Sequence, residues 1–133
     1  MPTLGEILTR GPVSVSPDQT VSEVAAEMAQ GRVGSAVVMD GAWLSGIVTE
    51  RDILRAVAQR ARAAEARVRQ WMTESVITIE PDTPIDEAAK MMFERNFRHL
   101  PVTKDGRLLG IVSLRRLSQY EFEHGKESVG SAE

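Results

Sequence analysis

The sequence predicts an α+β protein in which α and β elements are mixed within two β-α-β-β-α repeats, packed as a pseudo-twofold pair. The first observation is an internal repeat: with an offset of 64 residues, Pro17-Asp18 aligns with Pro81-Asp82, and the two halves of the chain stay aligned without a gap. The same offset places the Gly-Ile-Val of residues 46–48 on that of residues 110–112. The second observation is that each half carries strand, helix and hairpin signals in one order. Because a unit of roughly 60 residues buries only about 60% of its unfolded surface, the two copies are expected to pack together.

The first half begins with a β-branched run that suits a short strand and then continues into a helix. Residues 20–23 read Thr-Val-Ser-Glu, a capping box that predicts the start of this helix. The pair Asp40-Gly41 between two apolar runs predicts a β-hairpin. The expected strands and helices are, in chain order, Val13–Val15, Val21–Met28, Ala36–Met39, Leu44–Val48 and Ile53–Val57.

The second half repeats this order. Its first helix is expected to begin in residues 83–86, Thr-Pro-Ile-Asp, a variant capping box with Pro84 at the first helical position. The pair Asp105-Gly106 marks the hairpin turn. The expected elements are Val76–Ile79, Ile85–Met92, Leu100–Val102, Leu108–Val112 and Leu114–Tyr120.

The predicted domain boundaries follow the repeat. Residues 1–62 are expected to hold the first repeat with an N-terminal entry segment, and residues 63–70 a linker. Residues 71–124 are expected to form the second repeat and residues 125–133 a flexible tail. The stretch Gln59–Gln70, rich in Ala and Arg, is expected to continue the preceding helix and then turn into the second repeat.

Composition and charge exclude several classes of protein. Sixteen basic and nineteen acidic side chains give a formal charge of −3, and the pI is near 5.5, so no positive field attracts nucleic acid or an anionic membrane. The absence of cysteine excludes disulfides, thiolate metal sites and thiol nucleophiles. We find no signal peptide and no run of about 18 apolar residues, so a cytoplasmic protein is expected. Neither His99 nor His124 has a serine or an acid at the spacing of a triad or metal cluster, so neither an enzyme nor a metal site is expected.

Two segments resemble the signatures of a known family. Residues 46–52, Gly-Ile-Val-Thr-Glu-Arg-Asp, resemble the end of a CBS repeat, and residues 97–102, Phe-Arg-His-Leu-Pro-Val, resemble the segment that enters its hairpin. The resemblance covers roughly Leu4 to Glu123 and is that of a stand-alone tandem CBS pair, or Bateman module. It implies a disc-like pair of repeats, often a homodimer, whose clefts bind AMP, ADP, ATP, S-adenosylmethionine or NAD. It further implies that no cofactor is required and that an unknown protein is regulated in trans.

Thr49 and Asp52 are the candidate ligand contacts of the first repeat. A strand that ends at Val48 and a helix that begins near Glu50 leave unpaired N–H groups that favour a phosphate, and Thr49 adds a hydroxyl donor. Asp52 is an acceptor suited to two ribose hydroxyls. The alternative is structural, because Thr49-x-x-Asp52 is also a capping box that needs no ligand. The two roles are compatible, since both side chains have lone pairs to share.

The resemblance completes this site with residues of the second repeat. It places Val76 and Ile77 around the base, with Phe97 nearby. It also places Arg98 and Arg115 near the phosphates, where a planar guanidinium pairs with phosphate oxygens. Without the family, both arginines would be interpreted as solvated surface residues.

A possible second site, with Val13, Ser113 and Arg116, is expected to be degenerate. Arg116 stands at the position that Asp52 occupies in the first repeat. A guanidinium has donors only and cannot accept hydrogen bonds from ribose hydroxyls. One competent ligand site is therefore expected.

The residues leave two other functions open. One is a ligand-free protein-interaction or dimerisation module, which the missing acid at Arg116 favours. The other is nucleic-acid binding by the linker arginines, but Glu65 interrupts them, so a solvated helix face is the better interpretation. Trp43 and Trp71 are interpreted as packing residues.

Overall fold

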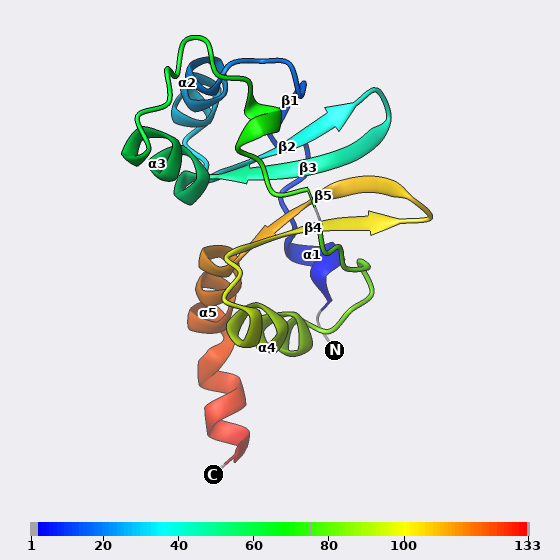
Figure 1. The fold of residues 1–133 in the computed structure, drawn as a ribbon. Coiled ribbons are helices and arrows are strands. Elements are labelled where there is room, and N and C mark those ends of the chain that lie inside the picture. Colours follow the sequence, from blue (N-terminus) through cyan, green and yellow to red (C-terminus); the bar gives the residue numbers. More distant parts are fainter. Residues whose placement is uncertain (1–2, 75, 133) are drawn as a thin grey trace. The chain divides into compact units, whose positions relative to one another are not determined.

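A computed structural model describes residues 3–74 and 76–132, with side chains as far as residue 124. It confirms the α+β class, with helices and strands in the predicted order except for one missing strand of the second repeat, and with a short additional helix at the start (Figure 1). The strands are β1 (Ser14–Val15), β2 (Ser35–Asp40), β3 (Trp43–Thr49), β4 (His99–Lys104) and β5 (Arg107–Ser113). The helices are α1 (Leu4–Ile7), α2 (Val21–Gly31), α3 (Glu50–Ala58), α4 (Ile85–Arg95) and α5 (Leu114–Ala132), with a 3₁₀ turn, η1 (Val68–Gln70).

The two predicted hairpins are confirmed and have the same register. β2 pairs antiparallel with β3, and β4 with β5. Val38 lies opposite Gly46, and Val102 lies opposite Gly110, which are the equivalent positions of the second repeat. Each hairpin has a bulge directly after this pair, so the repeat extends to its irregularities.

The strand predicted at Val76–Ile79 is wrong, because pairing is reduced there to a single parallel bridge at Ile79. In the first repeat, β1 pairs parallel with β2, and the Val37 N–H donates to the Val13 carbonyl at 2.9 Å. The position equivalent to Val37 is Pro101, which has no N–H group to donate. The second repeat therefore cannot form this hydrogen bond, and its parallel ladder is shorter.

The prediction that Gln59–Gln70 continues the preceding helix is also wrong. Helix α3 ends at Ala58, and Arg60 adopts the left-handed conformation with φ of 60°, in which a right-handed helix cannot continue. The chain then turns and forms η1, where Val68 is fully buried. The predicted linker is therefore a packed part of the structure.

The backbone of helix α5 runs from Leu114 to Ala132 and includes most of the segment predicted as a flexible tail. No proline follows Leu114, so no residue lacks the N–H that the helix needs. Glu133 lies outside the described residues.

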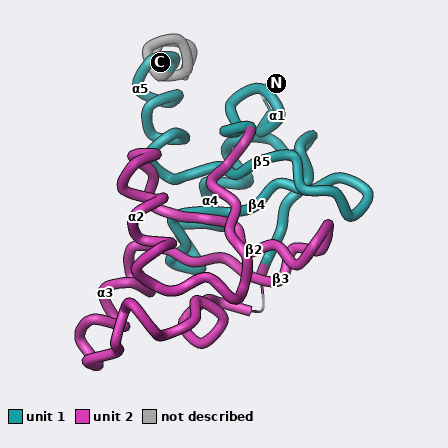
Figure 2. The backbone as a smooth tube through the Cα atoms, turned by 90° about the horizontal axis from the view of Figure 1, so that it is seen from above, with its two compact units in different colours: residues 1–10, 77–133 teal, residues 11–76 magenta. Residues whose placement is uncertain are grey.

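The chain forms two compact units, and neither is made of one repeat alone. Residues 11–76 form one unit, and residues 1–10 together with 77–133 form the other (Figure 2). Each unit thus contains the segment that precedes the other repeat. Thr9 forms a bridge with Ile111, and Thr73, its equivalent, forms the same bridge with Ile47. Because the exchange of segments is reciprocal, the internal repeat of the sequence does not reveal it.

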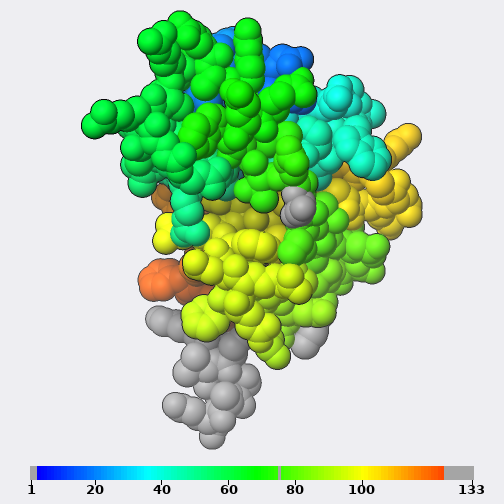
Figure 3. Space-filling model, in the orientation of Figure 1, coloured from blue at the N-terminus to red at the C-terminus, as the bar shows by residue number. Residues whose placement is uncertain are grey.

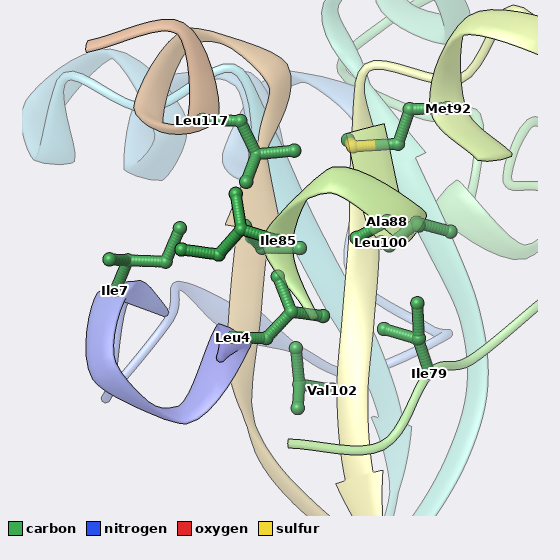
Figure 4. Close-up of a cluster of buried hydrophobic side chains, with 10 residues drawn as sticks. Leu4, Ile7, Ile79, Ile85, Ala88, Met92, Leu100, Val102 and Leu117 are labelled. Carbon is green, nitrogen blue, oxygen red and sulfur yellow. The ribbon is translucent and has the colours of Figure 1, made fainter. Parts of the chain in front are cut away.

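The exchanged segments supply core residues. In the unit that contains α4 and α5, Leu4 and Ile7 of α1 are buried among the apolar side chains of the second repeat (Figure 4). The backbone N–H of Leu4 donates to the Thr83 carbonyl at 3.1 Å. In the other unit Val68 takes the equivalent place, and its N–H donates to the Gln19 carbonyl at 2.8 Å. The core of each unit therefore includes side chains from a segment that precedes the other repeat.

Two equivalent glycines allow these segments to approach the hairpins. A Cβ atom at Gly46 would lie 2.7 Å from Met72 Sδ and 2.8 Å from the Thr73 carbonyl oxygen. A Cβ atom at Gly110 would collide with the Thr9 carbonyl oxygen and the Leu8 side chain. The glycine that precedes the Ile-Val of each repeat is thus required by close backbone packing.

The capping box predicted at the start of α2 is confirmed. The Glu23 carboxylate accepts from the Thr20 N–H at 3.1 Å, and Thr20 Oγ1 accepts from the Glu23 N–H at 3.1 Å. The hydrogen bond from the Thr20 backbone is the main cause that lowers the pKa of Glu23 from its usual value of 4.5. Because the folded state lowers this pKa, the contribution to stability is present at neutral pH and is lost as the pH falls through the lowered pKa.

Replacing Thr20 with alanine is expected to lower the free energy of unfolding by about 1 kcal/mol at neutral pH, because the cap is lost. Urea denaturation at neutral and acidic pH measures this change. The difference between the wild type and Glu23→Gln should shrink as the pH falls. Ser22→Ala, which removes an exposed hydroxyl from the same turn, is the matched control and should change stability little. An unaltered midpoint for Thr20→Ala would contradict the role of the cap.

Candidate functional site

Thr49 and Asp52 lie where β3 passes directly into α3. The N–H and the hydroxyl of Thr49 both donate to Asp52 Oδ2, at 2.9 and 3.2 Å. Asp52 is 5% exposed, although it is a charged residue in the first turn of a helix. The capping interaction that the spacing predicts is therefore present, and it fixes one oxygen of a buried carboxylate.

Arg55 occupies the other side of this carboxylate, and sequence reasoning missed it. Its Nη2 lies 3.4 Å from Asp52 Oδ1 and donates to the Trp71 carbonyl at 2.9 Å. The guanidinium carbon lies 5.7 Å from the centre of the Trp71 ring, which is the geometry of a cation–π contact. The spacing of Asp52 and Arg55 on one helix could have indicated the ion pair. No local pattern could have indicated Trp71, which lies 16 residues further along the chain.

The equivalent place in the second repeat has a different chemistry. Ser113 Oγ accepts from the N–H of Arg116 at 3.0 Å and so caps α5 in the usual way. The guanidinium of Arg116 replaces the carboxylate of Asp52. In the first repeat the backbone carbonyl of Val13, also predicted for the second site, accepts from Val37 within the sheet.

The remaining predicted site residues are divided between the two units. Val76 is half-buried at the end of the unit of residues 11–76. Ile77 and Phe97 belong to the other unit, where both pack in part against the core. The structure thus places Thr49 and Asp52 together, and the joining of both sets of residues into one site stays a prediction.

The backbone of Arg98 is bonded to the start of α5, where Arg115 is the second residue. The Arg98 carbonyl accepts from the N–H of Leu114, the first residue of that helix, at 2.7 Å, and Arg115 follows directly. Both side chains are exposed. The two residues thus share a backbone connection at this helix start, and the role of their guanidinium groups in binding phosphate stays a prediction.

The described residues contain neither a candidate metal site nor a candidate membrane-spanning helix. Over residues 3–74 and 76–124, whose side chains the structure describes, no three His, Asp or Glu side chains are grouped so that they could hold a metal ion. In the same residues, no helix is both long and apolar enough to cross a membrane.

Comparison with known proteins gives two family matches. The family model described as CBS domain matches residues 4–59 and again residues 68–123. The CBS domain-containing protein YhcV of Bacillus subtilis is 30% identical over 132 residues, which are 99% of this chain and 93% of YhcV. A protein of Methanopyrus kandleri, MK0525, is 35% identical over 122 residues, or 90% of this chain. The match spans 62% of MK0525, so that relative is considerably longer.

Two similar solved structures contain adenosine compounds. The CBS domain protein PAE2072 of Pyrobaculum aerophilum, complexed with AMP, is 39% identical, with a TM-score of 0.80 over 86% of this chain and 89% of that one. The CBS domain pair of protein MJ0100, in complex with 5′-methylthioadenosine and S-adenosyl-L-methionine, is 27% identical. Its TM-score is 0.85 over 92% of this chain and 98% of that one. The fold is thus shared with proteins whose ligands have adenosine in common.

Proposed function

Because the chain belongs to the CBS-domain family, with a match to each of its two repeats, we propose that it is a regulatory module rather than an enzyme. It binds an adenosine-containing nucleotide in the cleft between the repeats and signals in trans to another protein of the cytoplasm. The observation that carries this proposal is the buried carboxylate of Asp52 at the start of α3. A buried carboxylate with acceptor capacity to spare is suited to the two hydroxyls of a ribose.

The other candidate residues match the remaining parts of a nucleotide. Val76, Ile77 and Phe97 are half-buried and apolar, as a surface that receives an adenine ring must be. Arg98 and Arg115 are exposed at the start of α5 and offer paired donors to phosphate oxygens. We therefore propose that the first repeat binds the ribose. The residues from Val76 onward would bind the base and the phosphate.

AMP is the ligand that we favour, with ADP and ATP next. AMP is bound in the PAE2072 structure, and 5′-methylthioadenosine and S-adenosyl-L-methionine in that of MJ0100. All share the adenosine that Asp52 would recognise, so S-adenosylmethionine and NAD stay candidates. The second site, with Val13, Ser113 and Arg116, is proposed not to bind a nucleoside, because Arg116 has no acceptor for ribose.

Thermal unfolding of the purified protein with AMP, ADP, ATP, S-adenosylmethionine and NAD tests this function. A ligand present at 100 times its dissociation constant should stabilise the protein by about 2.7 kcal/mol, which raises Tm by several degrees. GMP is the matched control, because it keeps the ribose and phosphate and changes only the base. No shift with any adenosine compound, from protein that is free of bound nucleotide, would contradict the proposal.

A second candidate function is a ligand-free interaction module that works as a homodimer. Figure 3 shows one face of the surface, coloured by residue number. Among the side chains described, four exposed large apolar ones lie on helices: Leu54 and Val57 on α3, Phe93 on α4 and Phe122 on α5. Trp43 on β3 is also exposed, so its interpretation as a packing residue is wrong. A continuous apolar patch on the surface would favour contact with another protein, and these side chains are the candidates to form one. Sedimentation of the nucleotide-free protein distinguishes the two cases, because a stable dimer without any response to adenosine compounds supports this second function.

A further inference from the structure

Arg55 is held in place by a part of the chain that the proposed function does not use. Its Nη2 donates to the Trp71 carbonyl at 2.9 Å, and its guanidinium group lies over the Trp71 ring at 5.7 Å. Trp71 follows η1, whose Val68 is buried in the core of this unit, so the anchor itself is fixed. Half of the Arg55 side chain is exposed, but the hydrogen bond and the ring contact give its guanidinium group a preferred direction before any ligand binds.

The lengths of the contacts indicate what Arg55 does for Asp52. Oδ2 of Asp52 already accepts two hydrogen bonds from Thr49. Arg55 Nη2 lies 3.4 Å from Oδ1, whereas a charge-assisted hydrogen bond is about 2.7–2.9 Å long. Arg55 Nη2 therefore attracts Oδ1 electrostatically, while it donates its hydrogen bond to the Trp71 carbonyl. Oδ1 keeps acceptor capacity that a ligand hydroxyl can use.

The second repeat lacks every part of this arrangement. The positions equivalent to Asp52, Arg55 and Trp71 hold Arg116, Gln119 and Ile7. The side chain of Gln119 instead donates to Glu123 along its own helix, at 3.4 Å. The arginine and its aromatic anchor thus occur in the repeat that has the carboxylate and are missing from the repeat that lacks it.

We infer that Arg55 is a positioning residue for ligand binding: anchored on Trp71, it holds the Asp52 carboxylate so that Oδ1 faces the ribose hydroxyls. The inference rests on the proposed adenosine site, where Asp52 would bind the ribose hydroxyls, and adds to it only the role of Arg55. Arg55 acts through Asp52 and does not contact the ligand. Its effect must therefore depend on whether the ligand has hydroxyls for Asp52 to bind.

Calorimetric titration with AMP and with 2′,3′-dideoxy-AMP tests this dependence. Arg55→Gln is expected to raise the Kd for AMP about tenfold, which corresponds to about 1.4 kcal/mol. The same variant should leave the weaker binding of 2′,3′-dideoxy-AMP nearly unchanged. Arg62→Gln is the matched control, because it removes an equal charge from the same unit at an exposed residue that pairs with Glu65. Its Kd for both ligands should equal that of the wild type.

The outcomes separate the inference from the function on which it rests. Wild-type protein that binds no adenosine compound overturns both. Wild-type binding with an unaltered Kd in Arg55→Gln overturns the role of Arg55 alone, and so does an equal loss for both ligands, which indicates a general effect of charge. Circular dichroism without ligand checks the fold of each variant. If Arg55→Gln does not fold, Arg55→Lys gives the same comparison, because lysine keeps the charge but lacks the planar fork that binds Trp71.

Discussion

Replacing Gly110 with alanine is expected to lower the free energy of unfolding by about 3 kcal/mol and Tm by about 10 °C. The added methyl group would collide with the Thr9 carbonyl oxygen and with the Leu8 side chain. Thr9 exchanges both backbone hydrogen bonds with Ile111, at 2.8 and 3.0 Å, so the segment cannot withdraw without breaking them. Thermal and urea unfolding, followed by circular dichroism, measure the loss.

Gly5→Ala is the matched control for this substitution. A Cβ atom there would lie 3.4 Å from its nearest neighbour, the Pro81 carbonyl oxygen, which is an ordinary contact within the same unit. Its effect should stay below about 1 kcal/mol. Gly46→Ala repeats the experiment in the other unit and should also be strongly destabilising. A Gly110→Ala protein as stable as the wild type would contradict the packing of residues 1–10 described above.

Asp52→Ala is expected to abolish stabilisation by adenosine ligands while the protein stays folded. At a ligand concentration of 100 times the wild-type Kd, the variant should lose the whole gain of about 2.7 kcal/mol. The reason is that alanine offers no acceptor to the two ribose hydroxyls, and each hydrogen bond to a charged group contributes about 1.5–3 kcal/mol. Without ligand, the variant should lose about 1 kcal/mol, because the cap of α3 is removed. Thermal unfolding with and without AMP measures both quantities.

Arg98→Ala extends this experiment to the phosphate side of the proposed site. It should likewise remove most of the response to AMP, whereas adenosine without phosphate should be affected little. Lys104→Ala is the control, since it removes an exposed cation from the end of β4. Unaltered binding of AMP in both Asp52→Ala and Arg98→Ala would sink the assignment of the site.

The features that were predictable from the sequence are those with local causes. The capping boxes at Thr20 and Thr49 depend on residues three positions apart, and both are present. The variant predicted at Thr83 is wrong, because α4 begins at Ile85 and its N-cap is Pro84, which has no side-chain group that can cap. The hairpins follow from an Asp-Gly pair between apolar runs. Asp52 was found by its place in a signature and by its spacing from Thr49, and the structure adds that it is buried.

The features that were missed depend on contacts between distant parts of the chain. Pairing of Thr9 with Ile111 gives no signal in the residues around either one. The predicted strand near Ile79 is absent because Pro101 has no N–H group with which to pair it. The segment opposite Pro101 is not evident from the residues around the proline. The anchor of Arg55 on Trp71 is of the same kind. The joining of Asp52 with Arg98 in one site stays a prediction, since it depends on how two separate units meet.

The exchange of segments also determines how the protein responds to a break in its backbone. The chain passes from one unit to the other twice, after Arg10 and after Val76. A protease cut between Val76 and Ile77 would leave residues 1–10 attached to the first fragment, with Leu4 and Ile7 still buried in the core of the second. The two pieces would therefore stay together in native buffer and separate in denaturant. The same property would let two separately expressed halves reassemble, so this junction is a natural place to split the protein for a complementation reporter.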